Sequence, residues 1–116
     1  MVLVTGGCAS GKKTFALSLG YTETDIADAV LDERPAVCHV EQLVARYEGS
    51  VADLAKELAD KELVACREMG CGPVPANAED RELREKVGRL NAMLAEEASC
   101  VVRMVCGIPC VIKGEL

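Results

Sequence analysis

The sequence has little positive charge. Its 116 residues contain 13 lysines and arginines against 19 aspartates and glutamates, which gives a formal net charge of -6. A general electrostatic attraction to a nucleic-acid backbone or to an anionic membrane is therefore not expected. Any binding of phosphate groups has to be local.

Long apolar runs are also missing. No run approaches the roughly 18 residues that a membrane-spanning helix needs, and the first residues lack the basic, apolar and small-residue order of a secretory signal. We therefore expect a cytoplasmic protein without a membrane span. Repeats, linkers and low-complexity tracts are absent as well. Because 50% of the residues are hydrophobic, we expect one packed domain over residues 1–116.

The sequence also lacks cysteine and histidine pairs at the spacing of metal ligands. The seven cysteines include no C-x-x-C pair, and His39 is the only histidine. The spacing thus gives no support for a zinc site, and we assign no metal ligands. Four cysteines lie in or beside apolar runs, where a free thiol behaves as a small buried hydrophobe. These are Cys66, Cys100, Cys106 and Cys110. A weaker alternative is a thiol-based metal or redox module of Cys66, Cys71, Cys106 and Cys110.

Short β-branched runs alternate with longer segments of helical period. The runs cover 2–5, 36–40, 63–66 and 100–106. This alternation predicts an α/β domain with a mainly parallel sheet and helices on both faces. After Gly107 and Pro109, residues 110–113 are predicted to turn back as an antiparallel edge strand.

Capping residues and apolar periodicity predict three helices between these runs. Residues 83–94 carry an apolar stripe and follow a possible N-cap at Asn77. A second helix is predicted after Ser50, and a third, short one through 26–30, capped by Thr22 or Thr24. Pro35 would interrupt the third helix.

Residues 6–14 read GGCASGKKT, after the first apolar run and before the helix-like FALSL. A glycine-rich turn in this context directs backbone N–H groups at a phosphate, and the following helix adds the positive end of its dipole. We therefore expect a nucleoside triphosphate, ATP or GTP, to bind here. The residues expected to contact it are Gly6, Gly7, Cys8, Ala9, Ser10, Gly11, Lys12, Lys13 and Thr14.

The motif GxxxxGK is complete, but the hydroxyl that should follow Lys12 and bind magnesium is replaced by Lys13. Thr14 lies about 100° further round the helix and does not take over without a shift of the loop. Mg²⁺ is therefore possible without its usual ligand. Alternatively, the two lysines offset phosphate charge themselves, or Lys13 reflects drift after a loss of activity.

Two segments in the second half are distinctive: REMGCGPVP at 67–75 and DRELREKVGRLNAMLAEEASCVVRMVCGIPCVIKG at 80–114. Together with the glycine-rich turn, they resemble the bifunctional adenosylcobinamide kinase and adenosylcobinamide-phosphate guanylyltransferase family of cobalamin biosynthesis. Matching positions are Gly6, Gly7, Ser10, Gly11, Lys12, Glu68, Gly70, Gly72, Val74, Pro75, Gly88, Arg89, Leu90, Asn91, Gly107, Pro109 and Lys113. The resemblance implies a P-loop fold, phosphorylation of adenosylcobinamide and a homo-oligomer.

The middle of the chain departs from this family. The segment that carries the family's GMP-accepting histidine is shortened, so the resemblance gives little support for guanylyl transfer. AVCHVEQLV resembles the family's VLVDCLTLW, which puts His39 at the acidic position that supports magnesium. A packed histidine is the plainer interpretation of His39.

We expect Lys12 and Glu68 to be the catalytic residues. An ammonium at the position of Lys12 neutralises β- and γ-phosphate oxygens during transfer. Glu68 follows an apolar run at the strand end where ligands bind in open α/β sheets, although a structural ion pair is an equal alternative. The leading hypothesis is an adenosylcobinamide kinase. The alternative is a nucleotide- or corrinoid-binding regulatory pseudoenzyme of the same fold.

Overall fold

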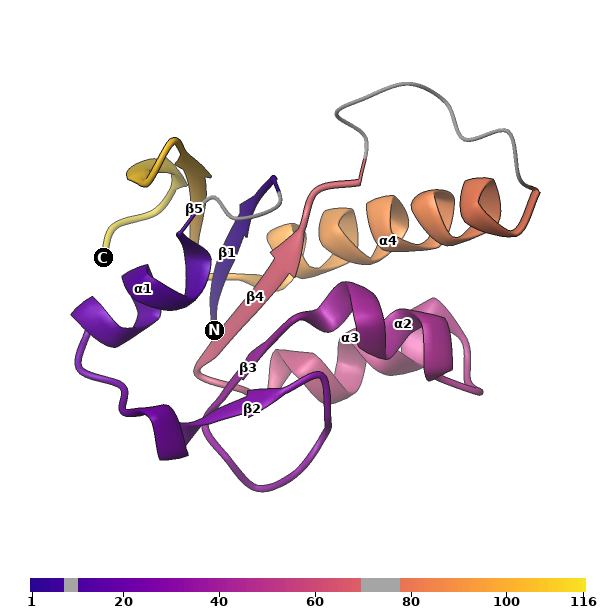
Figure 1. The fold of residues 1–116 in the computed structure, drawn as a ribbon, viewed down its shortest axis with the longest axis horizontal. Coiled ribbons are helices and arrows are strands. Elements are labelled where there is room, and N and C mark those ends of the chain that lie inside the picture. Colours follow the sequence, from indigo (N-terminus) through magenta and orange to yellow (C-terminus); the bar gives the residue numbers. More distant parts are fainter. Residues whose placement is uncertain (8–10, 70–77) are drawn as a thin grey trace.

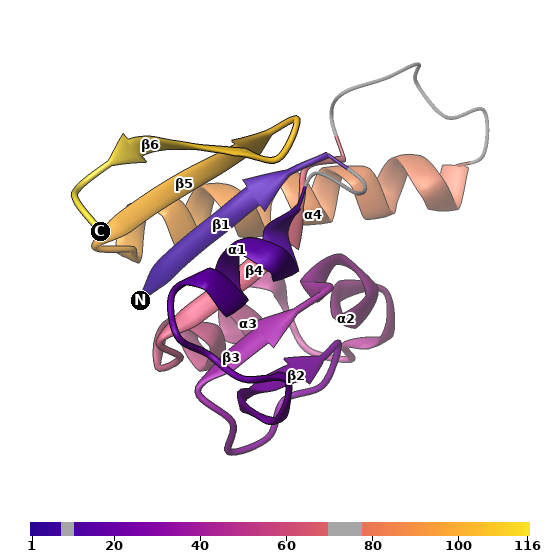
Figure 2. The ribbon, with the colours of Figure 1, turned by 60° about the vertical axis from the view of Figure 1, so that its left-hand side comes forward.

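The structure, a computed structural model, describes residues 1–7, 11–69 and 78–116. These residues form a six-stranded sheet in the order β2-β3-β4-β1-β5-β6. The strands are β1 (Val2–Gly6), β2 (Ile26–Asp28), β3 (Ala36–Cys38), β4 (Leu63–Arg67), β5 (Cys100–Val105) and β6 (Ile108–Lys113). β1 to β5 pair in parallel, whereas β6 returns antiparallel to β5 and forms one edge of the sheet (Figure 1, Figure 2). The predicted fold class is confirmed.

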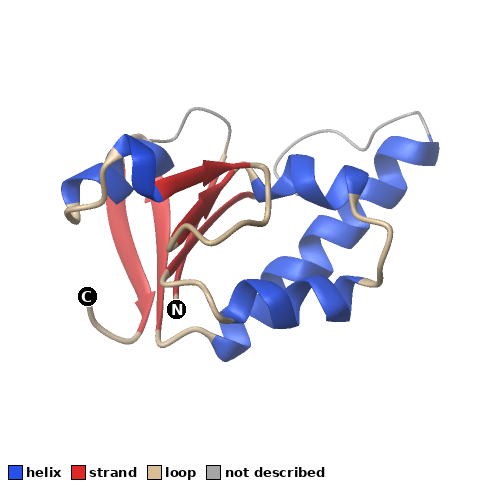
Figure 3. Ribbon diagram, turned by 90° about the horizontal axis from the view of Figure 1, so that it is seen from below, coloured by secondary structure: helices blue, strands red, loops and turns tan. Residues whose placement is uncertain are grey.

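Helices cover both faces of this sheet (Figure 3). They are α1 (Lys12–Ser18), α2 (Val40–Arg46), α3 (Val51–Ala59) and α4 (Ala78–Glu97), with a single 3-10 turn, η1 (Glu23–Asp25). Successive strand residues alternate between the two faces. Leu3 belongs to the cluster under α2, α3 and α4, and Val4 to the cluster under α1. Buried on both faces, the parallel strands are almost continuously apolar, as their sequence pattern predicts.

The two longer helices agree with their sequence signals. The Ser50 hydroxyl oxygen accepts a hydrogen bond from the Asp53 N–H at 3.1 Å and caps α3. α4 contains the predicted stripe, in which Val87, Leu90 and Leu94 are fully buried. The predicted cap at Asn77 lies outside the described residues.

The predicted helix through 26–30 is wrong. Thr22 does begin a turn, because its N–H and hydroxyl both donate to the Asp25 carboxylate at 2.9 Å. The turn ends at Asp25, and Ile26 then pairs with Ala36 as the chain enters β2. Burial of Ile26 and Ala27 in the sheet outweighs the local helical signal.

The predicted strand at 36–40 is too long by two residues. β3 ends at Cys38, His39 takes a left-handed conformation with φ of 54°, and Val40 begins α2. α2 was not predicted, yet Val40 and Val44 lie one helical turn apart and both pack into the core. The apolar residues after His39 thus serve a helix.

Burial also corrects part of the cysteine prediction. Cys66 and Cys100 are buried, as expected, but Cys106 and Cys110 are exposed. They lie in the β5–β6 hairpin, and every residue of β6 is exposed at this edge of the sheet (Figure 2). In the described part of the chain, no helix is both long and apolar enough to cross a membrane.

Candidate phosphate-binding site

The predicted site residues follow three neighbouring strands of the sheet. The turn at 7–14 follows β1, Glu68 follows β4, and His39 follows β3. These strands are parallel, and Gly6 pairs in register with Arg67. The three segments therefore meet at the carboxyl edge, where open α/β sheets bind ligands.

The described part of the glycine-rich turn has the geometry of a helix entry. Gly11 precedes α1 with φ of 93°, a conformation that strains any residue with a Cβ atom. Its carbonyl accepts the Phe15 N–H at 2.9 Å, and the Lys12 ammonium donates to the Gly7 carbonyl at 2.7 Å. The Lys12 side chain thus reaches back to Gly7, at the start of the turn. Cys8, Ala9 and Ser10 lie outside the described residues, and their predicted phosphate contacts remain predictions.

A cavity of about 300 Å³ opens beside this turn. It is lined by Gly11, Lys12, Lys13, Thr14, Cys38, His39 and Ala65. The wall therefore combines two ammonium groups and one hydroxyl with the end of β3. This chemistry suits an anionic ligand, and the volume is at the lower end of those of small-molecule pockets.

Lys13 takes part in an ion pair at the rim of the cavity. Its ammonium lies 2.8 Å from the Glu23 carboxylate, and both side chains are largely exposed. The hydrogen bond and the negative charge of Glu23 raise the pKa of Lys13. The group is thus a cation where related loops carry a magnesium-binding hydroxyl.

The fit to Mg²⁺ is poor at the described residues of the cavity. Mg²⁺ prefers oxygen ligands in octahedral geometry. Thr14 offers a hydroxyl, but Lys13, Cys38 and His39 offer nitrogen or sulfur. These described residues therefore do not supply the oxygen ligands of a Mg²⁺ site.

Asp28, Cys38 and His39 come together at the ends of β2 and β3. The distance from His39 Nδ1 to Asp28 Oδ1 is 2.7 Å, and Cys38 Sγ lies 3.5 Å from Nδ1 and 3.9 Å from Oδ1. Burial, and then the Asp28 carboxylate, raise the pKa of the Cys38 thiol to about 11. His39 is thus paired with a carboxylate and a thiol at the wall of the cavity, and not simply packed.

Glu68 lies one residue beyond β4 and links three strands. Its N–H donates to the Gly6 carbonyl at 2.8 Å. Its carboxylate accepts the Thr5 hydroxyl at 3.1 Å and two Arg103 donors at 3.0 and 3.2 Å. Thr5 is a buried polar residue. These contacts agree with the structural alternative, and the predicted catalytic role of Glu68 is untested.

A comparison with protein-family models identifies residues 26–112 as cobinamide kinase / cobinamide phosphate guanyltransferase. The match covers most of the chain. The chain belongs to this family. A search of the curated proteins finds no match. The matched range begins after the glycine-rich turn, so the family match includes neither the turn nor α1.

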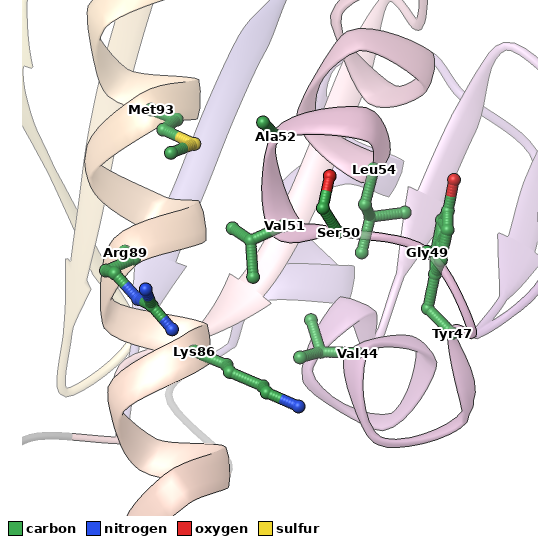
Figure 4. Close-up of a pocket in the computed structure, with 10 residues that line it drawn as sticks. All are labelled: Val44, Tyr47, Gly49, Ser50, Val51, Ala52, Leu54, Lys86, Arg89 and Met93. Atoms are coloured by element: carbon green, nitrogen blue, oxygen red, sulfur yellow. The ribbon is translucent and has the colours of Figure 1, made fainter.

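Residues 88–91 of α4, which read GRLN, lie in different environments. Arg89 lines a second cavity of about 410 Å³, between α4 and the α2–α3 segment. Figure 4 shows the side chains of Lys86 and Arg89 extending from α4 toward the α2–α3 segment, with Lys86 directed toward Val44. Leu90 is fully buried, and Asn91 donates its side-chain N–H to the Arg67 carbonyl at 3.3 Å. Of residues 88–91, it is Arg89 that lines the cavity between α4 and the α2–α3 segment.

Sequence reasoning missed Asp28, Cys38 and Glu41. The Glu41 carboxylate accepts the Arg67 N–H at 3.0 Å and ties α2 to the end of β4. Asp28 and Cys38 are ten positions apart, so spacing alone gave no signal. Only the pairing of β2 with β3 brings them together, and β2 was not predicted.

The alternative module of cysteines is not found among the described residues. Cys66, Cys106 and Cys110 form no cluster there, and Cys71 lies outside the described residues.

Proposed function

We propose that this chain binds a purine nucleoside triphosphate, ATP or GTP, at the turn of residues 6–14 and phosphorylates adenosylcobinamide. Membership of the cobinamide kinase family supports the substrate class. The single observation that carries the proposal is the position of the Lys12 ammonium. It lies 2.7 Å from the Gly7 carbonyl, beside a cavity that is also lined by Lys13 and Thr14. We also propose that residues 1–116 act as one P-loop domain.

In this reaction the hydroxyl oxygen of the aminopropanol arm attacks the γ-phosphorus, and the bond to the β–γ bridging oxygen breaks. The nucleoside diphosphate leaves, and the hydroxyl proton passes to solvent. Lys12 neutralises charge on the phosphate oxygens, while the amides of the turn and the hydroxyls of Ser10 and Thr14 orient them. In this proposal, catalysis comes from the orientation of the phosphate groups and from the positive charge of Lys12.

We do not propose guanylyl transfer for this chain. β2 ends at Asp28 and β3 begins at Ala36, which leaves a short connection and no additional helix for an acceptor histidine. His39, the chain's only histidine, follows β3 and pairs with Asp28.

The test is steady-state phosphoryl transfer to adenosylcobinamide with ATP and with GTP. We expect Lys12→Ala to lower kcat by at least about 100-fold, since it removes a cation that acts on the transition state. Lys56→Ala removes an exposed lysine from α3 and should leave kcat unchanged. Equal loss in both variants, or turnover that Lys12→Ala does not affect, would contradict the proposal.

A regulatory protein without turnover is the second candidate, and the observation that favours it is Lys13 at the position of the magnesium-binding hydroxyl. Tight binding of nucleotide or cobinamide with no phosphoryl transfer would support this candidate. Its Lys13→Ser variant, which restores the hydroxyl, should then gain magnesium-dependent nucleotide binding.

If instead the lysine pair offsets phosphate charge, calorimetry should find that the wild-type chain binds ATP or GTP with little dependence on magnesium. Affinity that strictly requires magnesium and is unchanged in Lys13→Ser would refute this role of Lys13. We further propose that the chain forms a homo-oligomer through the exposed edge strand β6.

A further inference from the structure

We propose that Asp28, Cys38 and His39 form a binding site for one Zn²⁺ ion at the carboxyl ends of β2 and β3. Their oxygen, sulfur and nitrogen atoms all lie within 4.8 Å of one another. In the part of the chain that the structure describes, no other group of three such residues is this close. The proposal does not depend on phosphoryl transfer.

The backbone fixes this arrangement. Asp28 and Cys38 are register partners in the parallel pair of β2 and β3. The Ala29 N–H donates to the Cys38 carbonyl at 2.9 Å and holds the two strand ends together. His39 then adopts φ of 54° and ψ of 41°, a left-handed turn in which its ring nitrogen lies beside the preceding thiol. Histidine tolerates this region better than most residues do.

The distances are close to those of a tetrahedral zinc site. With bonds of about 2.0–2.3 Å to nitrogen, oxygen and sulfur, the ligand atoms are about 3.4–3.6 Å apart. Cys38 Sγ lies 3.5 Å from His39 Nδ1 and 3.9 Å from Asp28 Oδ1. His39 Nδ1 and Asp28 Oδ1 are 2.7 Å apart and would separate by about 0.7 Å when an ion replaces their hydrogen bond.

The donor set selects the metal. A thiolate and an imidazole favour Zn²⁺ over Mg²⁺ or Ca²⁺, which require oxygen ligands. On binding, the Cys38 thiol loses its proton to solvent and His39 becomes the tautomer with its proton on Nε2. The thiolate and the Asp28 carboxylate then balance the charge of the ion. The nearby Lys13 ammonium is already paired with Glu23 at 2.8 Å.

The site has both access and a place for a fourth ligand. The Asp28 side chain is 69% exposed and that of His39 44%, so an ion can enter from solvent. Cys38 and His39 also line the cavity of about 300 Å³ beside Lys12 and Thr14. Three protein ligands with water in the fourth position match the pattern of open zinc sites.

Titration of the full chain with Co²⁺, followed by Zn²⁺, tests the proposal. The double variant Cys106→Ser and Cys110→Ser serves as the background, because it removes the exposed thiols of the hairpin. We expect one equivalent of Co²⁺ to give tetrahedral visible bands and a thiolate-to-cobalt charge-transfer band. One equivalent of Zn²⁺ should abolish them.

Changes in the three ligands provide the specific readout. Cys38→Ser should eliminate the charge-transfer band, and Asp28→Asn and His39→Asn should each weaken Zn²⁺ binding at least about tenfold. Cys100→Ser, a matched change of a buried strand cysteine, should retain the band. Circular dichroism verifies folding. If Cys38→Ser does not fold, the variants of Asp28 and His39, whose side chains are more exposed, decide the question.

Any of three results would overturn the site. The first is no cobalt spectrum in the folded background variant. The second is a spectrum that persists in folded Cys38→Ser, and the third is Zn²⁺ affinity unchanged by both Asp28→Asn and His39→Asn. In the second and third cases the ion would be bound elsewhere. Nucleotide binding is measured separately, so failure here leaves the proposed function untouched.

Discussion

Burial divides the described cysteines into two chemical classes. Cys38, Cys66 and Cys100 are buried in the sheet, whereas Cys106 and Cys110 are exposed in the hairpin. Desolvation disfavours a thiolate, because the charged form loses its hydration. The reactivity of these thiols should therefore follow their burial in the fold, because the sequence pattern does not distinguish Cys66 and Cys100 from Cys106 and Cys110.

We predict that iodoacetamide at about pH 8 modifies Cys106 and Cys110 in the folded chain long before Cys66. Burial, and then the Glu41 charge, raise the pKa of Cys66 to about 12. Its thiolate fraction at that pH is then on the order of one in ten thousand. Peptide mapping by mass spectrometry measures each site. Modification of folded Cys66 at the rate of Cys106 would contradict the predicted burial, and the denatured chain, in which all thiols react, is the control.

The αL residue between β3 and α2 shows how a single position changes the chemistry of the neighbouring elements. With His39 left-handed at φ of 54°, β3 stops at Cys38 and the imidazole lies beside Asp28. A non-glycine residue in this region costs on the order of 1 kcal/mol. The pairing of β2 with β3 on one side and the burial of Val40 on the other offset this cost.

At the scale of elements, α4 contains a glycine that nothing in its surroundings requires. Gly88 lies in the middle of this 20-residue helix and is exposed. A Cβ atom there would have no neighbour within 4 Å. Glycine in a helix interior is destabilising relative to alanine because it loses more backbone entropy on folding.

Gly88→Ala should therefore raise the free energy of unfolding by about 0.5–1 kcal/mol, measured by urea denaturation. Gly114→Ala is the matched control with the opposite sign, because Gly114 has φ of 70° and its Cβ would collide with the Ser99 carbonyl oxygen. We expect it to lower stability. A loss of stability in Gly88→Ala would mean that this part of α4 contacts something other than solvent.

Element prediction succeeded where a local signal and the tertiary environment agree. For α3, the Ser50 cap and the apolar stripe both act within one segment. For β1 and β4, continuous apolar runs are what strands buried on both faces require. β2 failed because three residues that follow a capped turn carry no strand signal of their own. They become a strand only through the partner Ala36–Cys38.

The candidate site, too, was predictable only where its residues lie next to elements with a clear signal in the sequence. The glycine-rich turn, Lys12 and Glu68 are contiguous with strong strand signals, so their common edge followed from parallel topology. Asp28 and Cys38 depend on a strand pair that the sequence did not reveal. The contacts of the Glu68 carboxylate could not be predicted from the sequence either, because its two partners, Thr5 and Arg103, lie 63 and 35 positions away.

For the whole molecule, the two edges of the sheet differ. β2 has three residues, whereas β6 has six, all of them exposed. Ile108 and Ile112 are each 64% exposed on β6. An exposed edge strand with apolar side chains presents unpaired backbone groups to another chain. A second copy of this chain is the partner that a symmetric oligomer would supply.

Sedimentation equilibrium should therefore find a species larger than the monomer, and Ile112→Lys should shift it toward the monomer, since a lysine on an edge strand opposes pairing. Leu31→Lys is the control, because Leu31 is an exposed apolar residue that follows β2 at the other edge. The net charge adds a prediction about salt. Each subunit carries a formal charge of -6, so two subunits repel each other electrostatically. At 0.1–0.15 M salt this repulsion is screened beyond about 8–10 Å, and association through apolar contacts should therefore strengthen as salt is added. A wild-type monomer at every salt and protein concentration, or an oligomer lost in Leu31→Lys and retained in Ile112→Lys, would exclude β6 as the interface.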